Sequence, residues 1–138
     1  GNDRDAWLDL ILTERVVPRL SDDRLTVIHH YPASQAALAR SCPDAPNWAD
    51  RFEVFYGNLE LANGFVELTD ADEQLARFER DREARRSRNL PVEEIDMDLI
   101  NALRAGLPPC AGVAVGFDRL LMVHEGKDDI TAISNFVS

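Results

Sequence analysis

The sequence has few cysteines and no long apolar run, and both absences restrict where such a protein works. Cys42 and Cys110 are the two cysteines among 138 residues. They lie far apart, match no metal-ligand spacing and cannot supply the disulfide framework of a secreted scaffold. No apolar stretch approaches the ~20 residues of a membrane span, and no basic and apolar signal segment begins the sequence. We therefore expect a protein of the reducing cytoplasm with no membrane partner.

Positive charge is also scarce in this sequence. Lys and Arg total 15 against 25 Asp and Glu, which gives a formal net charge of -10. Because proteins bind phosphate backbones through clustered Lys and Arg, this balance argues against a broad nucleic-acid surface, and RNA contact would need a separate domain. Surplus carboxylates suit a cationic ligand or a metal ion, although an acidic surface also serves solubility alone.

Several familiar chemical motifs are absent. There is no Walker phosphate loop and no GxGxxG dinucleotide fingerprint. His29, His30 and His124 have no companion ligand at zinc spacing, so structural or surface roles are favoured for them. No nucleophile, base and orienting acid can be assembled, so a catalytic triad is not predicted.

The pattern of apolar and polar residues predicts one compact unit with helices and strands. Its 138 residues, 45% of them hydrophobic, suffice for one ordinary domain. Helical periodicity and capping residues predict helices over residues 5–20, 34–41, about 70–88, 96–105 and 117–124. Short β-branched runs predict strands over residues 25–31, 51–56, 59–62 and 112–116, and a proline-containing loop is expected over 42–46.

Gly57 and Asn58 form a two-residue turn between two of these strands, and the length of the turn determines how the strands pair. The predicted pairs are Tyr56 with Leu59, Phe55 with Glu60 and Glu53 with Ala62. One face of the hairpin would then carry Glu53, Phe55, Glu60 and Ala62. The more apolar opposite face would carry Val54, Tyr56, Leu59 and Leu61.

Glu53 and Glu60 become diagonal neighbours in this hairpin. Diagonal positions lie roughly 7–8 Å apart, so both carboxylates could reach one Mg²⁺ ion or its phosphate ligands. Two solvent-facing glutamates are the alternative and the commoner arrangement. Strict alternation places Glu67 on the face opposite Glu60, so Glu67 joins the same pocket only if the strand is irregular near Gly64. There its carboxylate could hold an ammonium group.

A second candidate site lies where a strand passes directly into a helix. Residues 112–116 are small or β-branched, and Arg119 follows in the first turn of the helix. Helix N-termini favour anions, and a guanidinium can donate two hydrogen bonds to phosphate oxygens. Arg119 is therefore a candidate phosphate ligand. The alternative is that the small residues only allow the helix to pack on the sheet.

Four segments together resemble the C-terminal half of the lysine-type class II aminoacyl-tRNA synthetases. They are YPASQ at 31–35, RFEVFY at 51–56, ELANGFVEL at 60–68 and GVAVGFDR at 112–119. The last is similar to the third class II signature motif, and ELANGFxEL is similar to the lysine branch in particular. The resemblance covers most of the chain. It implies an α+β fold, mainly an antiparallel sheet flanked by helices, that forms an incomplete class II catalytic core.

The same resemblance implies a reaction and assigns residues to it. The carboxylate of a lysine-type amino acid would attack the α-phosphate of ATP in the presence of Mg²⁺, giving an adenylate and pyrophosphate. Positioning and charge neutralisation would supply most of the catalysis. The residues implied are Glu53 and Glu60 for the metal; Glu60, Leu61, Gly116 and Arg119 for ATP, with Arg119 also catalytic; and Asn63, Glu67 and Ala114 for the substrate.

Ala114 distinguishes two branches of this family. Lysyl-tRNA synthetases resemble one another in having glycine there, whereas their paralogues that modify elongation factor P resemble this chain in having alanine. The YPASQ and ELANGF segments are also similar to those paralogues. The resemblance thus implies transfer of (R)-β-lysine to a lysine of elongation factor P, and tRNA is not the expected acceptor. A fragment of a lysyl-tRNA synthetase that charges tRNA with lysine, and a non-catalytic binding module, are the alternatives.

Two parts of the family pattern have no counterpart in the sequence. Nothing resembles the first class II motif, which forms the dimer interface, or the second, which supplies an ATP-binding arginine. We therefore expect residues 1–138 to be the C-terminal portion of a class II synthetase-like catalytic domain, inactive in isolation, whose parent is a homodimer. A fragment of a longer enzyme is the favoured interpretation, and a natural truncated paralogue that binds without catalysing is the alternative.

Overall fold

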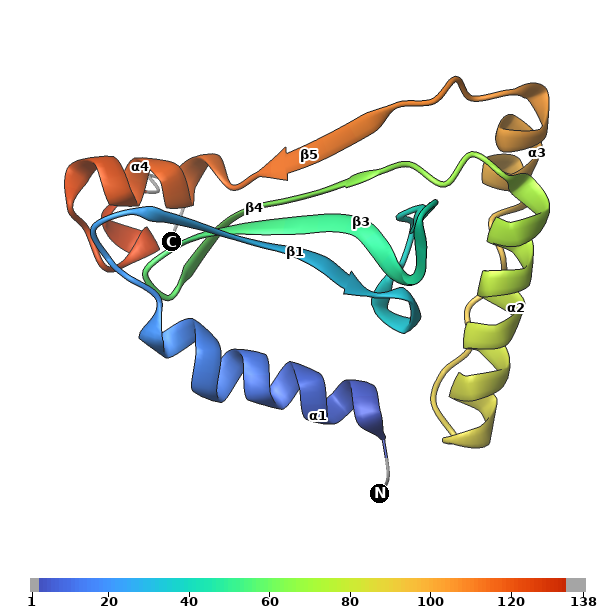
Figure 1. Cartoon of the computed structure of the whole chain (residues 1–138), viewed down its shortest axis with the longest axis horizontal. Coiled ribbons are helices and arrows are strands. Elements are labelled where there is room, and N and C mark those ends of the chain that lie inside the picture. Colours follow the sequence, from blue (N-terminus) through green and yellow to red (C-terminus); the bar gives the residue numbers. More distant parts are fainter. Residues whose placement is uncertain (1–2, 134–138) are drawn as a thin grey trace.

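The computed structural model describes residues 3–133, which form an antiparallel sheet with helices along parts of its edge (Figure 1). Four strands lie side by side in the order β1-β3-β4-β5, and a short strand, β2, pairs with β3. Their bounds are β1 (Leu25–Pro32), β2 (Ser41–Cys42), β3 (Ala45–Tyr56), β4 (Leu59–Val66) and β5 (Ala111–Val115). Every one of these pairs is antiparallel. The predicted α+β class with a mainly antiparallel sheet is confirmed.

The helices lie at the two ends of the sheet and beside β1 (Figure 1). They are α1 (Arg4–Ile11), α2 (Ala71–Ser87), α3 (Met97–Ala105) and α4 (Phe117–Glu125), with 3-10 turns at Ala33–Gln35 and Ile130–Ala132. α2 packs on α3 at one end, whereas α4 follows β5 directly at the other end. Within residues 3–133, no helix combines the length and the apolar character needed to cross a bilayer.

Aspartate side chains begin three of the helices. Asp3, Asp70 and Asp96 accept hydrogen bonds from backbone N–H groups in the first turns of α1, α2 and α3. These N–H groups have no partner inside the helix, so the caps explain why each helix begins directly after its aspartate. Gly116 precedes α4 at the capping position and has no side chain with which to cap the helix.

Two predicted helices differ from the structure. The helix expected over residues 5–20 is α-helical only to Ile11, after which Leu12–Val16 forms a π turn and Val17–Arg19 a 3-10 turn. Pro18 lacks the N–H that a continuing helix requires. The helix expected over residues 34–41 is wrong: the chain forms a 3-10 turn at Ala33–Gln35 and then takes a positive φ of 50° at Ala37.

The segment after Ala37 is held by tertiary hydrogen bonds in place of helical ones. The Leu68 N–H donates to the Leu38 carbonyl at 3.0 Å, and the Arg40 N–H donates to the Val66 carbonyl at 2.8 Å. β3 also begins at Ala45, inside the expected loop over residues 42–46. Local helix propensity is therefore overridden by pairing with the end of β4 and the residues after it.

The sheet register departs from prediction at one residue of β4. The pairs next to the turn are as predicted: Tyr56 with Leu59, and Phe55 with Glu60. The next pairs are Val54 with Ala62 and Glu53 with Asn63. One residue, Leu61, is thus extra in β4, which makes it the site of a β-bulge. The predicted pair of Glu53 with Ala62 is wrong because Ala62 shares a face with Val54.

The fold buries less surface than a complete domain of its mass. Its accessible surface is 9842 Å² at 15.5 kDa, whereas about 7,200 Å² is expected for a compact monomer of that size. A small core of Ala36, Ala39 and Ala49 packs with Phe65. On the other face of the sheet, the described helices leave apolar side chains more than half exposed, namely Val27, Val113 and Val115.

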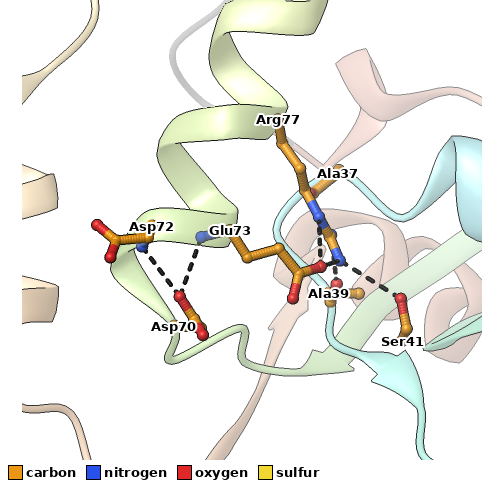
Figure 2. Close-up of polar contacts among 7 residues, drawn as sticks. All are labelled: Ala37, Ala39, Ser41, Asp70, Asp72, Glu73 and Arg77. Carbon is orange, nitrogen blue, oxygen red and sulfur yellow. Dashed lines mark hydrogen bonds and ion pairs between the residues drawn. The ribbon is translucent and has the colours of Figure 1, made fainter.

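Arg77 fastens α2 to the segment that precedes β2 (Figure 2). Its guanidinium donates to the Ala39 carbonyl at 2.7 Å and the Ala37 carbonyl at 3.2 Å, and it pairs with Glu73 one turn earlier in α2. The Arg77 side chain is only 14% exposed. Because the planar fork reaches two carbonyls and a carboxylate together, a lysine ammonium cannot replace it.

We expect Arg77→Lys to lower the free energy of unfolding by about 1–2 kcal/mol, because the carbonyl of the buried Ala39 and that of Ala37 lose a charged donor. Urea denaturation of the protein measures this change. Arg86→Lys is the matched control, since Arg86 forms an exposed pair with Glu83 in the same helix and should change stability by less than about 0.5 kcal/mol. Equal losses in both variants would contradict the anchoring role.

Candidate functional site

A row of predicted site residues crosses three strands on one face of the sheet. Glu53 of β3 pairs with Asn63 of β4, and Asn63 pairs with Ala114 of β5. Paired residues of antiparallel strands project to the same face, so these three residues lie in line. We call the face that carries Glu53, Asn63 and Ala114 the site face.

The bulge at Leu61 brings Glu60 to the site face together with Asn63. These residues are three apart, so strict alternation would place them on opposite faces. The extra residue between them restores both to the same face, since Glu60 pairs with Phe55 and Asn63 with Glu53. An irregularity of the kind that the sequence analysis required therefore exists, but it lies at Leu61 and not near Gly64.

Gly64 has a packing role on the opposite face. A Cβ built at Gly64 would lie 2.6 Å from the Phe52 ring and 2.8 Å from the Gly112 carbonyl oxygen. Neither the rigid ring nor the neighbouring backbone can move aside cheaply. Glycine at this position therefore reflects the close approach of β3 and β5 to β4.

Glu67 also reaches the site face, just beyond the end of β4. Its Oε1 atom would lie 3.3 Å from a Cβ built at Gly112, and Gly112 pairs with Phe65, two residues before Glu67. The Glu67 N–H donates to the Cys110 carbonyl at 3.0 Å, which fixes the backbone there. The carboxylate thus lies over β5 on the same face as Asn63.

Arg51 lies at the centre of the site face, and the sequence analysis did not single it out. Its guanidinium donates to Glu53, to Asn63 Oδ1 at 3.4 Å and to the Gln35 carbonyl at 3.0 Å. It also lies over the Tyr31 ring, 4.4 Å from the centroid. The available signal was alternation, because Arg51 and Glu53 are two residues apart in one strand and share a face.

The pKa of the Tyr31 hydroxyl depends on the charged residues of the site face. The Tyr31 side chain is buried, and its hydroxyl makes no hydrogen bond of normal geometry with any residue that the structure describes. Burial raises the pKa of the Tyr31 hydroxyl, and the negative charges of Glu53 and Glu60 raise it further while Arg51 opposes them. Both glutamates therefore act on one point of the face, although Glu53 pairs with Asn63 and not with Ala62.

Arg119 of α4 lies against the start of β4. Its Nη1 donates to the Glu60 carbonyl at 2.8 Å and lies 3.9 Å from the Glu60 carboxylate. The Gly116 N–H donates to the Leu61 carbonyl at 2.8 Å. A Cβ built at Gly116 would lie 3.3 Å from Arg119 Cδ, so the missing side chain leaves room for Arg119. The four residues predicted for ATP, Glu60, Leu61, Gly116 and Arg119, are thus in one place.

An open groove borders the site face on the side of α1. Its volume is about 520 Å³, and its lining includes Asp9, Gln35, Tyr31, Arg51 and Glu53. A larger hollow of about 780 Å³ lies at the turn end of the β3–β4 hairpin, with Tyr56 and Lys127 in its lining, and none of the predicted site residues contributes to it. Polar groups of the site face therefore open onto the groove.

Comparison with known proteins identifies the family to which the chain belongs. Residues 12–138 match the family model described as tRNA synthetases class II (D, K and N). Similar curated proteins are named elongation factor P--(R)-beta-lysine ligase: from Klebsiella pneumoniae subsp. pneumoniae (50% identical), Salmonella gallinarum (49%) and Yersinia enterocolitica (48%). Each similarity extends over 97% of this chain and 41% of the relative. The chain thus spans less than half the length of these relatives.

The Arg51 network predicts a measurable coupling between Arg51 and Glu53. Their side chains are 19% and 12% exposed, so we expect a double-mutant cycle of Arg51→Gln and Glu53→Gln to give about 1–3 kcal/mol of coupling in the free energy of unfolding. The matched cycle uses Arg24 and Asp23, a pair whose side chains are 69% and 66% exposed. That cycle should give less than about 1 kcal/mol. Similar coupling in both cycles would refute the central place of Arg51.

Proposed function

Because this chain belongs to the class II tRNA synthetases (D, K and N), we propose that residues 1–138 form the C-terminal portion of a catalytic domain that activates a lysine-type amino acid with ATP. The observation that carries the proposal is the site face itself. Glu53, Glu60, Asn63 and Glu67 gather on one face of the sheet, with Arg119 beside Glu60. Carboxylates for a cation and a guanidinium for a polyphosphate thus stand at one site.

The ATP end of the site would lie at the start of α4. Gly116 caps α4 without a side-chain acceptor, so the first N–H groups of the helix are free of such a partner and favour an anion. Arg119 is half exposed, and within residues 3–133 its polar partners are the Glu60 carbonyl and, through a long ion pair, the Glu60 carboxylate. We propose that Arg119 turns from this contact to the terminal phosphate of ATP, with Leu61 and Gly116 shaping the adjacent surface.

Glu53 and Glu60 fit a magnesium ion that is shared with phosphate oxygens. Both are carboxylates on one face, and Mg²⁺ takes one or two carboxylates together with phosphates. When bound, the ion would neutralise charge on the phosphates during transfer. Arg51 holds the Glu53 carboxylate through Oε1.

The amino acid end of the site would lie between β4 and β5. Glu67 lies over Gly112, while Asn63 pairs with Ala114 in the neighbouring row. A carboxylate attracts an ammonium about 4 Å away by on the order of 4 kcal/mol at an effective dielectric near 20, before desolvation costs. We propose that Glu67 holds an ammonium of the substrate, that Asn63 contacts its polar groups and that the Ala114 methyl shapes the pocket around its backbone.

The proposed reaction needs no covalent enzyme intermediate. The substrate carboxylate attacks the α-phosphate of ATP, the bond to pyrophosphate breaks, and an aminoacyl adenylate forms. The residues of the site face act by positioning the two reactants and by balancing the charge of the phosphates. Arg119, next to the leaving pyrophosphate, is the residue proposed to act most directly on the reacting groups.

The proposed acceptor is a lysine of elongation factor P, to which the activated (R)-β-lysine would pass. The relatives at about 50% identity carry the name of that ligase. The net charge of -10 also suits a protein acceptor better than tRNA, because a polyanion requires a basic surface. Cytoplasmic location and a homodimeric parent belong to the same proposal.

A chimera tests this function directly. We expect the Klebsiella pneumoniae relative, with this chain in place of its matching segment, to catalyse ATP-pyrophosphate exchange that depends on (R)-β-lysine and is weaker with α-lysine. The isolated chain should catalyse none, since it lacks the motifs noted above. Preference for α-lysine would favour a lysyl-tRNA synthetase, and a folded chimera with no exchange would refute the proposed reaction.

In the same chimera, Glu67→Gln should raise the amino acid concentration for half-maximal exchange by about 10–100-fold, because a charged hydrogen bond contributes about 1.5–3 kcal/mol. The KM for ATP should change little. Glu94→Gln is the control, since Glu94 is exposed and lines a hollow beside α2 together with Phe78 and Arg85. An unchanged amino acid dependence in Glu67→Gln would remove Glu67 from the substrate site.

A further inference from the structure

A second group of ligand-type side chains lies where β1, β2 and β3 meet. His30, Cys42 and Asp50 each offer one ligand atom, and these atoms all lie within 4.8 Å of one another. An imidazole nitrogen, a thiol sulfur and a carboxylate oxygen together are the donors used by Zn²⁺ and related transition metal ions. The proposed activation of lysine uses none of the three.

The backbone brings these residues together from separate strands. Between His29 and Tyr31 of β1, two residues of β3, Asp50 and Arg51, stand opposite His30. The register of β2 against β3 shifts between Ser41 and Cys42, so that Cys42 lies beside β3 as well. The three ligands come from separate strands, with 12 residues from His30 to Cys42 and 8 from Cys42 to Asp50. The short ligand spacings typical of zinc sites in a sequence therefore do not predict this group.

The arrangement of Asp50 is that of an oriented ligand. Arg40 donates to its Oδ2 atom from two nitrogens, at 2.6 and 3.1 Å, while the Cys42 thiol donates to its Oδ1 atom at 3.0 Å. The Arg40 contacts fix the carboxylate through one oxygen and direct the other at the sulfur. Metal-binding carboxylates are commonly held by a hydrogen-bonding partner of this kind.

His30 is held in a similar way. Its ring is hydrogen-bonded through Nδ1 to the ring of His29 and packs edge-on against it, with centroids 4.5 Å apart. The residue is exposed, and the hollow beside it is lined by His29, His30 and Asp50 among others. A metal ion would therefore have a path from solvent to His30 and Asp50, and the buried Cys42 thiol contacts Asp50.

We infer that His30, Cys42 and Asp50 bind a divalent transition metal ion of the zinc class, which ties β1 and β2 to β3. On binding, a metal–sulfur bond forms at Cys42 Sγ and the thiol proton leaves to solvent, with no change of oxidation state. The ion takes the place of that proton between the sulfur and Asp50 Oδ1, while Arg40 keeps its hold on Oδ2. Hard ions such as Mg²⁺ do not fit a site with sulfur and nitrogen donors.

The test is titration of the purified chain with Co²⁺, followed by absorption of the thiolate-to-cobalt charge-transfer band and by displacement with Zn²⁺. We expect one ion per chain with a thiolate band. Cys110→Ser is the decisive variant, because it leaves Cys42 as the one cysteine of the sequence. It should keep the band and the affinity. Loss of the band in Cys110→Ser, or cobalt binding with no thiolate band, would overturn the site.

Ligand variants extend this test. His30→Ala and Asp50→Asn should each weaken Co²⁺ binding by more than about 10-fold, whereas His124→Ala should bind as the unaltered chain does. Circular dichroism of each metal-free variant shows whether it is folded. If a ligand variant is unfolded, the comparison of wild type with Cys110→Ser decides the question. Equal affinity in His30→Ala, His124→Ala and wild type would contradict the assigned ligands.

Discussion

One extra residue in β4, the bulge at Leu61, determines which side chains the site face receives. Without it, the alternation that begins at Glu60 would carry Asn63 and Glu67 to the opposite face, among the exposed valines. With it, acid and amide groups from β4 stand in register with Glu53 of β3 and Ala114 of β5. The same residue also meets α4, since its carbonyl accepts the Gly116 N–H. The bulge therefore connects the two regions that are proposed to hold the amino acid and the phosphates.

Once the carboxylates share a face, their charge has to be balanced, and Arg51 does this within the chain. It bonds to Glu53 and Asn63 and lies over Tyr31, so three strands are linked through one guanidinium. Among the described ion pairs, Glu67 has no partner, and Glu60 has only the long and half-exposed contact with Arg119. Of the three glutamates on the site face, Glu60 and Glu67 are thus less compensated than Glu53, and their proposed ligands, a metal ion and an ammonium group, are both cations.

Sequence reasoning succeeded where short-range rules govern the chain. The two-residue turn at Gly57 correctly predicted the first pairs of the hairpin, and the aspartate at 96 marked the start of α3. It failed where distant contacts decide. Residues 34–41 are held by Arg77 and by the end of β4 in place of a helix. The bulge position depends on how β4 fits between two neighbours, and a periodic pattern carries no record of that fit. The role proposed for Asn63 came from family resemblance alone, whereas Glu67 and Arg119 were candidates from their own chemistry as well. Arg51 belonged to neither set and was missed.

The register of β3 against β4 is the most direct test of this account, and cross-strand nuclear Overhauser effects between backbone protons measure it in solution. The account predicts contacts that pair Val54 with Ala62 and Glu53 with Asn63, beside the pair of Phe55 with Glu60. Contacts that instead pair Glu53 with Ala62 would restore strict alternation across Leu61. That result would place Asn63 and Glu67 away from Glu60, and it would contradict a single site face.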